Sequence, residues 1–195
     1  MIIGIHGPLN GGKDTVANII QQMHPQQFGR YAFARPLKDA LKIMFGFSDL
    51  QLEDRKLKDE VDPFWGFTPR KAMQLLGTEF GRDMLRKDVW IKRAEHEASQ
   101  NERKKQGMLI TDVRFENEAE WLRSRDDAVL IYITAPDIMR DERYAHASEA
   151  GISRAHTDIT ISNDKRLGID ALTEQIKTVM CKLLPQYDVK FKELL

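Results

Sequence analysis

Apolar residues occur in two patterns along this chain. Short continuous runs are typical of buried strands, and longer segments with apolar residues every three or four positions are typical of amphipathic helices. The short runs predict five strands, at residues 1–6, 30–34, 108–115, 129–133 and 158–161. Because these runs alternate with helical segments, we expect an α/β fold: a three-layer sandwich in which a mostly parallel five-stranded sheet has helices on both faces.

The segments between the strands predict helices, some of which carry clear start signals. These helices are expected to begin near residues 16, 35, 69, 88, 116 and 169. Thr68 is a suitable N-cap, and Pro69 suits a first helical position, where its missing N–H costs nothing. Gly77 interrupts the helix that these two residues start, which indicates close approach of either a packed neighbour or a ligand.

Two polar segments interrupt the alternation of strands and helices. Residues 46–68 are rich in charges and aromatic rings, so they form either a mobile insert that covers a substrate or a solvated connection. We favour an insert on the substrate side. Residues 136–157 contain several arginines, including Arg140 and Arg143, and are expected to act as a lid. The length of 195 residues suits a single domain that includes both segments.

Composition narrows the class of protein. The 30 Lys and Arg residues balance the 30 Asp and Glu residues, which argues against general binding to nucleic-acid polymers or membrane surfaces. The single cysteine, Cys181, excludes an internal disulfide and fits a reducing compartment. The chain shows no signal-peptide pattern and no apolar run of bilayer length. We therefore expect a soluble, cytoplasmic protein.

A glycine-rich turn, Gly7–Thr15, lies between the first strand and the first helix. Its Gly-x4-Gly-Lys spacing is that of a loop whose backbone N–H groups surround phosphate oxygens. The helix that follows presents unpaired N–H groups to the same anion, and Lys13 adds a mobile positive charge. The alternative, a plain turn capped by Asp14, explains neither Lys13 nor the three glycines. The turn is therefore predicted to bind phosphate.

The residue after Lys13 is Asp14, and the hydroxyl usual at that position is displaced to Thr15. A carboxylate close to a triphosphate repels it unless a divalent cation lies between them. Asp14 or Thr15 is therefore expected to position Mg²⁺, and the sequence leaves open which of the two does so.

A second group of polar side chains is predicted near strand ends. Lys38 lies at a helix start, and Asp112 and Arg114 end the third strand, where ligands bind in open α/β sheets. Asp112 and Arg114 are two residues apart and would point the same way in an extended chain. The alternatives are a solvated lysine and a surface Asp–Arg pair.

Several short motifs together carry a family resemblance. They are Gly-Lys-Asp-Thr at 12–15, Pro-Leu-Lys-Asp-Ala-Leu at 36–41, Met-Gln-Leu-Leu-Gly-Thr at 73–78, Trp90, Asp-Val-Arg-Phe-Glu-Asn-Glu at 112–118, Ser-Glu-Ala-Gly at 148–151 and Asn163-Asp164. With them the chain resembles the deoxynucleoside monophosphate kinases of tailed bacteriophages, within the P-loop nucleoside monophosphate kinase superfamily. The resemblance implies Mg²⁺-assisted transfer of the ATP γ-phosphoryl group to a deoxynucleoside 5′-monophosphate.

The resemblance also implies roles for individual residues. The ATP site would contain Asn10, Gly11, Gly12, Lys13, Asp14, Thr15 and Asn163. The monophosphate site would contain Leu37, Lys38, Arg70, Gly77, Thr78, Trp90, Asp112, Arg114, Glu118 and Glu149. The catalytic cations would be Lys13, Arg70, Arg140 and Arg143.

Two other functions are compatible with a phosphate-binding loop. One is a different small-molecule P-loop kinase, acting on a metabolite such as dephospho-coenzyme A or phosphomevalonate. The other is a nucleotide-dependent switch, although such a protein requires neither the arginine-rich lid nor the second group of cations. The sequence leaves open the base preference, the choice between ribose and deoxyribose, and whether the chain forms a homodimer.

Overall fold

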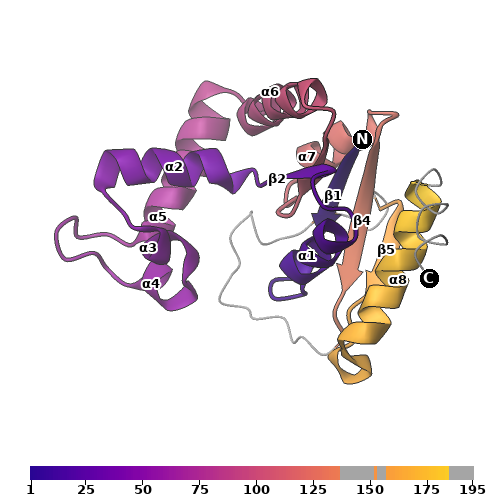
Figure 1. Cartoon of the computed structure of the whole chain (residues 1–195). Coiled ribbons are helices and arrows are strands. Elements are labelled where there is room, and N and C mark those ends of the chain that lie inside the picture. The colour runs from indigo at the N-terminus through magenta and orange to yellow at the C-terminus, as the bar shows by residue number, and fades with distance from the viewer. Residues whose placement is uncertain (137–151, 153–156, 185–195) are drawn as a thin grey trace. The chain divides into compact units, whose positions relative to one another are not determined.

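A computed structural model describes residues 1–136, 152 and 157–184, shown in Figure 1. By their internal contacts the residues divide into two compact units. The first unit comprises residues 1–30 together with the described residues from 98 onward, and the second comprises residues 31–97.

The described residues form a five-stranded sheet in the order β2-β3-β1-β4-β5. Its strands are β1 (Ile2–His6), β2 (Phe28–Tyr31), β3 (Gly107–Ile110), β4 (Ala128–Thr134) and β5 (Ile159–Ser162). β1 pairs in parallel with β3 and β4, and β4 pairs in parallel with β5. The predicted α/β fold with a mostly parallel sheet of five strands is confirmed.

Helices of the first unit cover both faces of this sheet (Figure 1). They are α1 (Lys13–Met23), α7 (Glu116–Arg123) and α8 (Gly168–Leu183), preceded by the 3₁₀ turn Lys165–Leu167. Ile3 and Ile5 of β1 join the core formed with α1 and α8. Gly4 faces the opposite side, where an added Cβ would lie 2.4 Å from Leu122 of α7. All five residues of β1 are buried, as a strand covered on both faces requires.

The second unit is helical. It contains α2 (Ala34–Phe45), α3 (Asp49–Glu53), α4 (Arg55–Asp59), α5 (Pro69–Gln74), a π-helix (Leu75–Leu85) and the start of α6 (Val89–Arg103). Leu37, Leu41, Phe47, Leu52 and Ala72 form its buried core. The predicted start of α5 is confirmed, since the Thr68 hydroxyl accepts a hydrogen bond from the Lys71 N–H at 3.1 Å and Pro69 follows the cap.

The π-helix replaces the interrupted α-helix that the sequence predicts around Gly77. The Gly77 carbonyl accepts hydrogen bonds from Trp90 Nε1 at 2.8 Å and from Arg82 Nη1 at 2.9 Å. A Cβ added to Gly77 would lie 3.2 Å from Leu37, and one added to Gly81 would lie 3.0 Å from the Trp90 ring. A packed neighbour therefore approaches Gly77 closely, which is one of the two alternatives that the sequence left open.

The bounds of two strands differ by several residues from the sequence prediction. β3 ends at Ile110 and not at 115, and the N–H groups of Arg114 and Phe115 bind the Glu118 side chain instead of a neighbouring strand. β2 lies at Phe28–Tyr31 and not at 30–34, since α2 already begins at Ala34. Residues 46–68 contain α3 and α4, whose N-caps Ser48 and Asp54 each accept backbone hydrogen bonds.

Among the described residues, no helix has both the length and the apolar character that crossing a membrane requires.

Candidate functional site

The predicted phosphate loop connects β1 to α1 in the first unit. Gly7, Asn10 and Gly12 have positive φ angles of 152°, 61° and 90°, and the Gly11 N–H bonds to the Pro8 carbonyl at 3.0 Å. These angles curl the backbone tightly. Gly12 stands at the N-cap of α1 and has no side chain to offer the N–H groups of the first turn. The helix start is therefore suited to receive an anion.

Lys13 holds its ammonium group against this loop. Its Nζ donates hydrogen bonds to the Gly7 carbonyl at 3.0 Å and to the Pro8 carbonyl at 2.8 Å. Carbonyl oxygens are weaker partners for an ammonium than phosphate oxygens, because a charged acceptor strengthens the bond. The Lys13 ammonium is thus held at the loop, where phosphate oxygens can replace the two carbonyls as its hydrogen-bond partners.

Asn163, which follows β5, packs against the loop from a distant part of the chain. Its Nδ2 donates to the Gly11 carbonyl at 2.9 Å, and its own N–H bonds to the Thr134 carbonyl at 2.8 Å. A Cβ added to Gly12 would lie 2.2 Å from Asn163 Nδ2. The φ of 90° at Gly12 favours glycine there, and the contact places Asn163 beside Gly11 and Gly12 of the assigned ATP site.

Asp14 and Thr15, the two candidate metal ligands, lie in the first turn of α1 and are both exposed. The Asp14 carboxylate accepts a hydrogen bond from Arg30 Nη2 at 2.6 Å. Arg30 also donates to the Asn18 side chain at 2.6 Å. Sequence reasoning did not single out Arg30. The available signal was the spacing of Asp14 and Asn18, which places two acceptors on one helix face.

His6 is a second residue that the sequence did not single out. Its side chain is only 2% exposed, its Nε2 lies 3.0 Å from the Thr157 hydroxyl, and its ring centroid is 4.8 Å from that of Tyr132. Burial lowers the pKa of His6 to about 4, and the positive charge of Lys13 contributes to the same shift. His6 is therefore neutral at pH 7 just before the phosphate loop.

Asp112, Arg114 and Glu118 follow β3 in the first unit. Because β1 and β3 are parallel neighbours, the segment with Asp112 and the phosphate loop leave the same edge of the sheet. Asp112 and Arg114 are both partly exposed there and lie beyond the end of β3. Glu118 is 1% exposed and accepts hydrogen bonds from the N–H groups of Arg114 at 2.8 Å and Phe115 at 3.1 Å.

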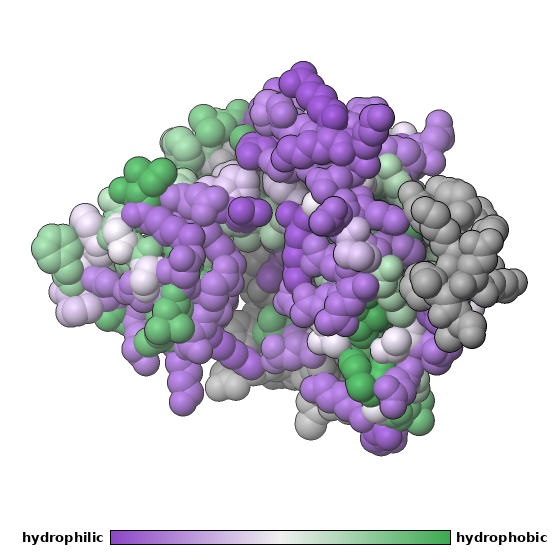
Figure 2. Space-filling view, viewed as in Figure 1, coloured by the Kyte–Doolittle hydropathy of each residue, from purple (hydrophilic) through white to green (hydrophobic). Residues whose placement is uncertain are grey.

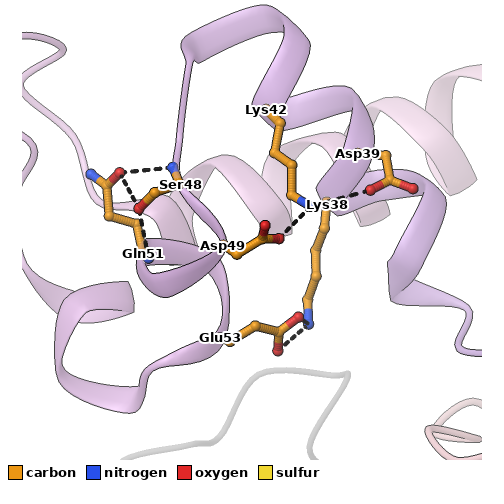
Figure 3. A network of polar contacts seen from close by, with 7 residues as sticks. All are labelled: Lys38, Asp39, Lys42, Ser48, Asp49, Gln51 and Glu53. Carbon is orange, nitrogen blue, oxygen red and sulfur yellow. Dashed lines mark hydrogen bonds and ion pairs between the residues drawn. The ribbon is translucent and has the colours of Figure 1, made fainter.

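Lys38 and Arg70, the candidate cations of the second unit, both pair with acids from residues 46–68. Lys38 Nζ lies 2.7 Å from each carboxylate oxygen of Glu53, as Figure 3 shows. Arg70 binds Asp59 through Nε at 2.5 Å and Nη2 at 3.3 Å. The neighbouring Lys42 pairs instead with Asp39 and Asp49 (Figure 3).

The other assigned residues of the second unit differ in accessibility. Leu37 is 7% exposed and belongs to the hydrophobic core, where it lies against Gly77. Trp90 is half-buried, and its indole N–H is bound to the Gly77 carbonyl. Thr78 is half-buried in the π-helix. Arg140, Arg143 and Glu149, with most of the expected lid at 136–157, lie outside the described residues.

An apolar groove of about 380 Å³ is a further feature of the second unit. Hydrophobic residues at the surface of this unit are visible in Figure 2. Lys71 is the charged member of a lining that otherwise consists of Leu41, Met44, Phe45, Phe67, Ala72, Leu75, Leu76 and Phe80. Such a lining does not suit a phosphate group, because it offers few polar partners.

The described residues contain no group of three or more His, Cys, Asp or Glu side chains that could hold a metal ion. Mg²⁺ in phosphoryl-transfer enzymes is commonly held by one or two protein oxygens together with substrate phosphates. The exposed Asp14 carboxylate and Thr15 hydroxyl, at the start of α1, fit that requirement.

Comparison with known proteins agrees with this geometry. The family described as deoxynucleotide monophosphate kinase matches residues 62–176. Over 214 residues the chain is 25% identical to the deoxynucleoside-5′-monophosphate kinase of Escherichia phage T5, covering 78% of this chain and 85% of that protein. It is 31% identical over 179 residues to a putative deoxynucleotide monophosphate kinase of Acanthamoeba polyphaga mimivirus, covering 86% of this chain and 90% of that protein.

Two solved structures share the fold. TT1252 from Thermus thermophilus has a TM-score of 0.53 at 16% identity, covering 94% of this chain and 97% of its own. Dephospho-CoA kinase from Campylobacter jejuni has a TM-score of 0.51 at 12% identity, covering 93% of this chain and 96% of its own. The family match, which spans more than half of the sequence, establishes that this chain belongs to the deoxynucleotide monophosphate kinase family and is a phosphotransferase.

Proposed function

We propose that the chain transfers the γ-phosphoryl group of ATP to a deoxynucleoside 5′-monophosphate, producing the diphosphate and ADP. The observation that carries this proposal is the phosphate loop, in which Lys13 lies over the loop carbonyls and Gly12 leaves the start of α1 without a side-chain cap. The names of the phage and mimivirus relatives support a deoxynucleoside monophosphate as the acceptor.

On the ATP side, the backbone N–H groups of the loop and of the first turn of α1 would bind phosphate oxygens. Lys13 would exchange the carbonyls of Gly7 and Pro8 for those oxygens and neutralise charge that develops during transfer. Asn163 would hold the loop in its curled form through its hydrogen bond to the Gly11 carbonyl.

On the acceptor side, Lys38 and Arg70 would bind the monophosphate, and Thr78 and Trp90 would contact the nucleoside. Asp112 and Arg114 would offer one acceptor and a fork of donors to a base edge. The acceptor phosphate is already an anionic nucleophile, so catalysis needs alignment and charge neutralisation and no strong general base. Arg70, Arg140 and Arg143 would supply that neutralisation.

Mg²⁺ would be held by Asp14 or Thr15 together with ATP, and when bound it would neutralise phosphate charge. In this proposal residues 1–195 act as one kinase domain. Residues 46–68 would serve the acceptor side, and residues 136–157 would close as a lid that excludes water. The enzyme would work in the cytoplasm, where ATP and monophosphates are available.

The test is a product assay that couples ADP release to each natural nucleoside monophosphate, in ribose and deoxyribose forms. We expect ATP consumption that requires a deoxynucleoside monophosphate and yields its diphosphate. ATP consumption without an acceptor would indicate a switch protein. Thermal-shift measurements would separate the other rival, because a ligand at 100 times its dissociation constant stabilises by about 2.7 kcal/mol. A selective shift with dephospho-coenzyme A or phosphomevalonate would contradict the proposal.

Replacing Lys13 by alanine tests the role of the loop directly. K13A is expected to abolish phosphoryl transfer and to retain the circular dichroism spectrum of the parent, because the side chain acts on the phosphates and is not part of the core. K177A is the matched control, since Lys177 forms an exposed pair with Glu174 on α8 of the same unit. Unchanged turnover by K13A would refute this mechanism.

A further inference from the structure

Arg30 connects β2 to the start of α1 in the first unit. One guanidinium nitrogen donates to Asp14 Oδ1 and the other to Asn18 Oδ1, both at 2.6 Å. Asp14 and Asn18 are four residues apart on α1 and therefore lie on one face of the helix. A planar guanidinium can reach both acceptors at once, whereas a lysine ammonium would present a single point charge.

The Asp14 carboxylate stands in the part of α1 that is suited to bind an anion. The first turn of a helix attracts negative charge through its dipole and its unpaired N–H groups. A carboxylate in that turn repels a phosphate that approaches the same N–H groups. An uncompensated Asp14 would therefore weaken the phosphate loop that it follows.

The exposure of the Arg30–Asp14 pair argues against a mainly structural role. The Asp14 side chain is 81% exposed and that of Arg30 is 35% exposed. Exposed ion pairs contribute little to folding stability. Their charge still acts on a ligand within the screening length, which is about 8 Å at physiological ionic strength.

We propose that Arg30 is a positioning residue of the nucleotide site, which cancels the charge of Asp14 and keeps its carboxylate beside Asn18 so that the start of α1 remains attractive to the triphosphate. This inference rests on the proposed function, because it takes ATP as the ligand of the loop. Arg30 acts through Asp14 and needs no contact with the nucleotide.

The test is calorimetric titration with ATP in EDTA and low salt, which removes any metal contribution of Asp14. R30Q is expected to weaken ATP binding about fivefold, because one uncompensated charge then faces the polyphosphate. D14N/R30Q should bind within about twofold of the parent, since the repelling charge is gone. The loss in R30Q should shrink in 1 M NaCl, where the Debye length is about 3 Å, whereas a loss caused by distortion would persist.

R125Q is the matched control, because Arg125 pairs with Asp127 in the same unit away from the phosphate loop. It should bind ATP as the parent does. ATP binding by R30Q equal to that of the parent would overturn the inference. A double variant as weak as R30Q would also overturn it, because Arg30 would then act on the nucleotide without Asp14. If the parent protein itself binds no ATP, the proposed function is overturned together with the inference. An unexpected result confined to R30Q or to the double variant overturns the inference alone and leaves the proposed function standing.

Discussion

Lys38 Nζ of α2 lies at the same distance, 2.7 Å, from both carboxylate oxygens of Glu53 on α3 (Figure 3). Arg70 of α5 also binds both carboxylate oxygens of one acid, Asp59 of α4, through two nitrogens at 2.5 and 3.3 Å. Lys38 and Arg70 thus each already hold a carboxylate from residues 46–68. Because Glu53 is mostly exposed, its pair with Lys38 is of the weak, solvent-screened kind. A phosphate can therefore replace the carboxylate at low cost.

Removal of the Glu53 charge is expected to favour the acceptor. With E53Q, the KM for the deoxynucleoside monophosphate should fall about two- to fivefold, since an exposed ion pair contributes at most about 1 kcal/mol. Initial rates at saturating ATP measure this effect. D49N is the matched control, because Asp49 pairs with Lys42 and not with Lys38. A KM that rises in E53Q would show that Glu53 orients Lys38 for the substrate and does not compete with it.

Gly12 should not tolerate a side chain. In G12A the new Cβ would meet Asn163 Nδ2 at 2.2 Å on a backbone with φ of 90°, so the loop is strained and Asn163 must give up its present position against it. We expect at least a tenfold loss of ATP affinity and a stability loss of about 1–3 kcal/mol. G168A is the control, since Gly168 has a φ of 77° but nothing within 4 Å. G168A should lose stability through strain alone and bind ATP normally. Equal ATP affinity for G12A and the parent would exclude this role for the loop.

Glu118 is expected to contribute mainly to stability. E118A should lower the free energy of unfolding by about 1–3 kcal/mol, because the N–H groups of Arg114 and Phe115 lose a buried acceptor. E120A, on an exposed position of the same helix, should change it by less than about 0.5 kcal/mol. Urea denaturation measures both. If E118A keeps full stability but loses acceptor binding, the backbone contacts of Glu118 are secondary to its assigned role at the monophosphate.

The buried His6 makes folding stability depend on pH. The unfolded chain protonates His6 near its ordinary pKa of 6.5, whereas the folded protein does so only near about 4. Between these values the unfolded state binds more protons, so stability should fall as pH decreases from 6.5 to 4. We expect roughly 2–3 kcal/mol over this range, since one unit of pKa shift corresponds to about 1.4 kcal/mol.

The measurement is urea denaturation from pH 7.5 to 4.5. H6N should show a shallower pH dependence than the parent, because asparagine can still bond to Thr157 and does not titrate. H24Q provides a comparison, since burial also lowers the pKa of His24. An H6N profile as steep as that of the parent would assign the pH dependence to other groups.

Local chain chemistry determined much of this protein. The apolar run of β1, the glycine spacing up to Lys13 and the Thr68-Pro69 helix start each depend on residues within a few positions of one another. These features were predictable because backbone sterics, capping and hydrophobic periodicity act over one or two turns. They were sufficient for the fold class and for the position of the glycine-rich turn between β1 and α1.

Only the tertiary structure decided which distant groups complete these features. The contact between Asn163 and Gly11 spans 152 positions, and that between His6 and Thr157 spans 151. Such partners are brought together by the packing of the sheet and its helices, and spacing along the chain does not encode that arrangement. The sequence alone thus determined the loop and its lysine, whereas the fold decided which side chains hold that loop and balance its charge.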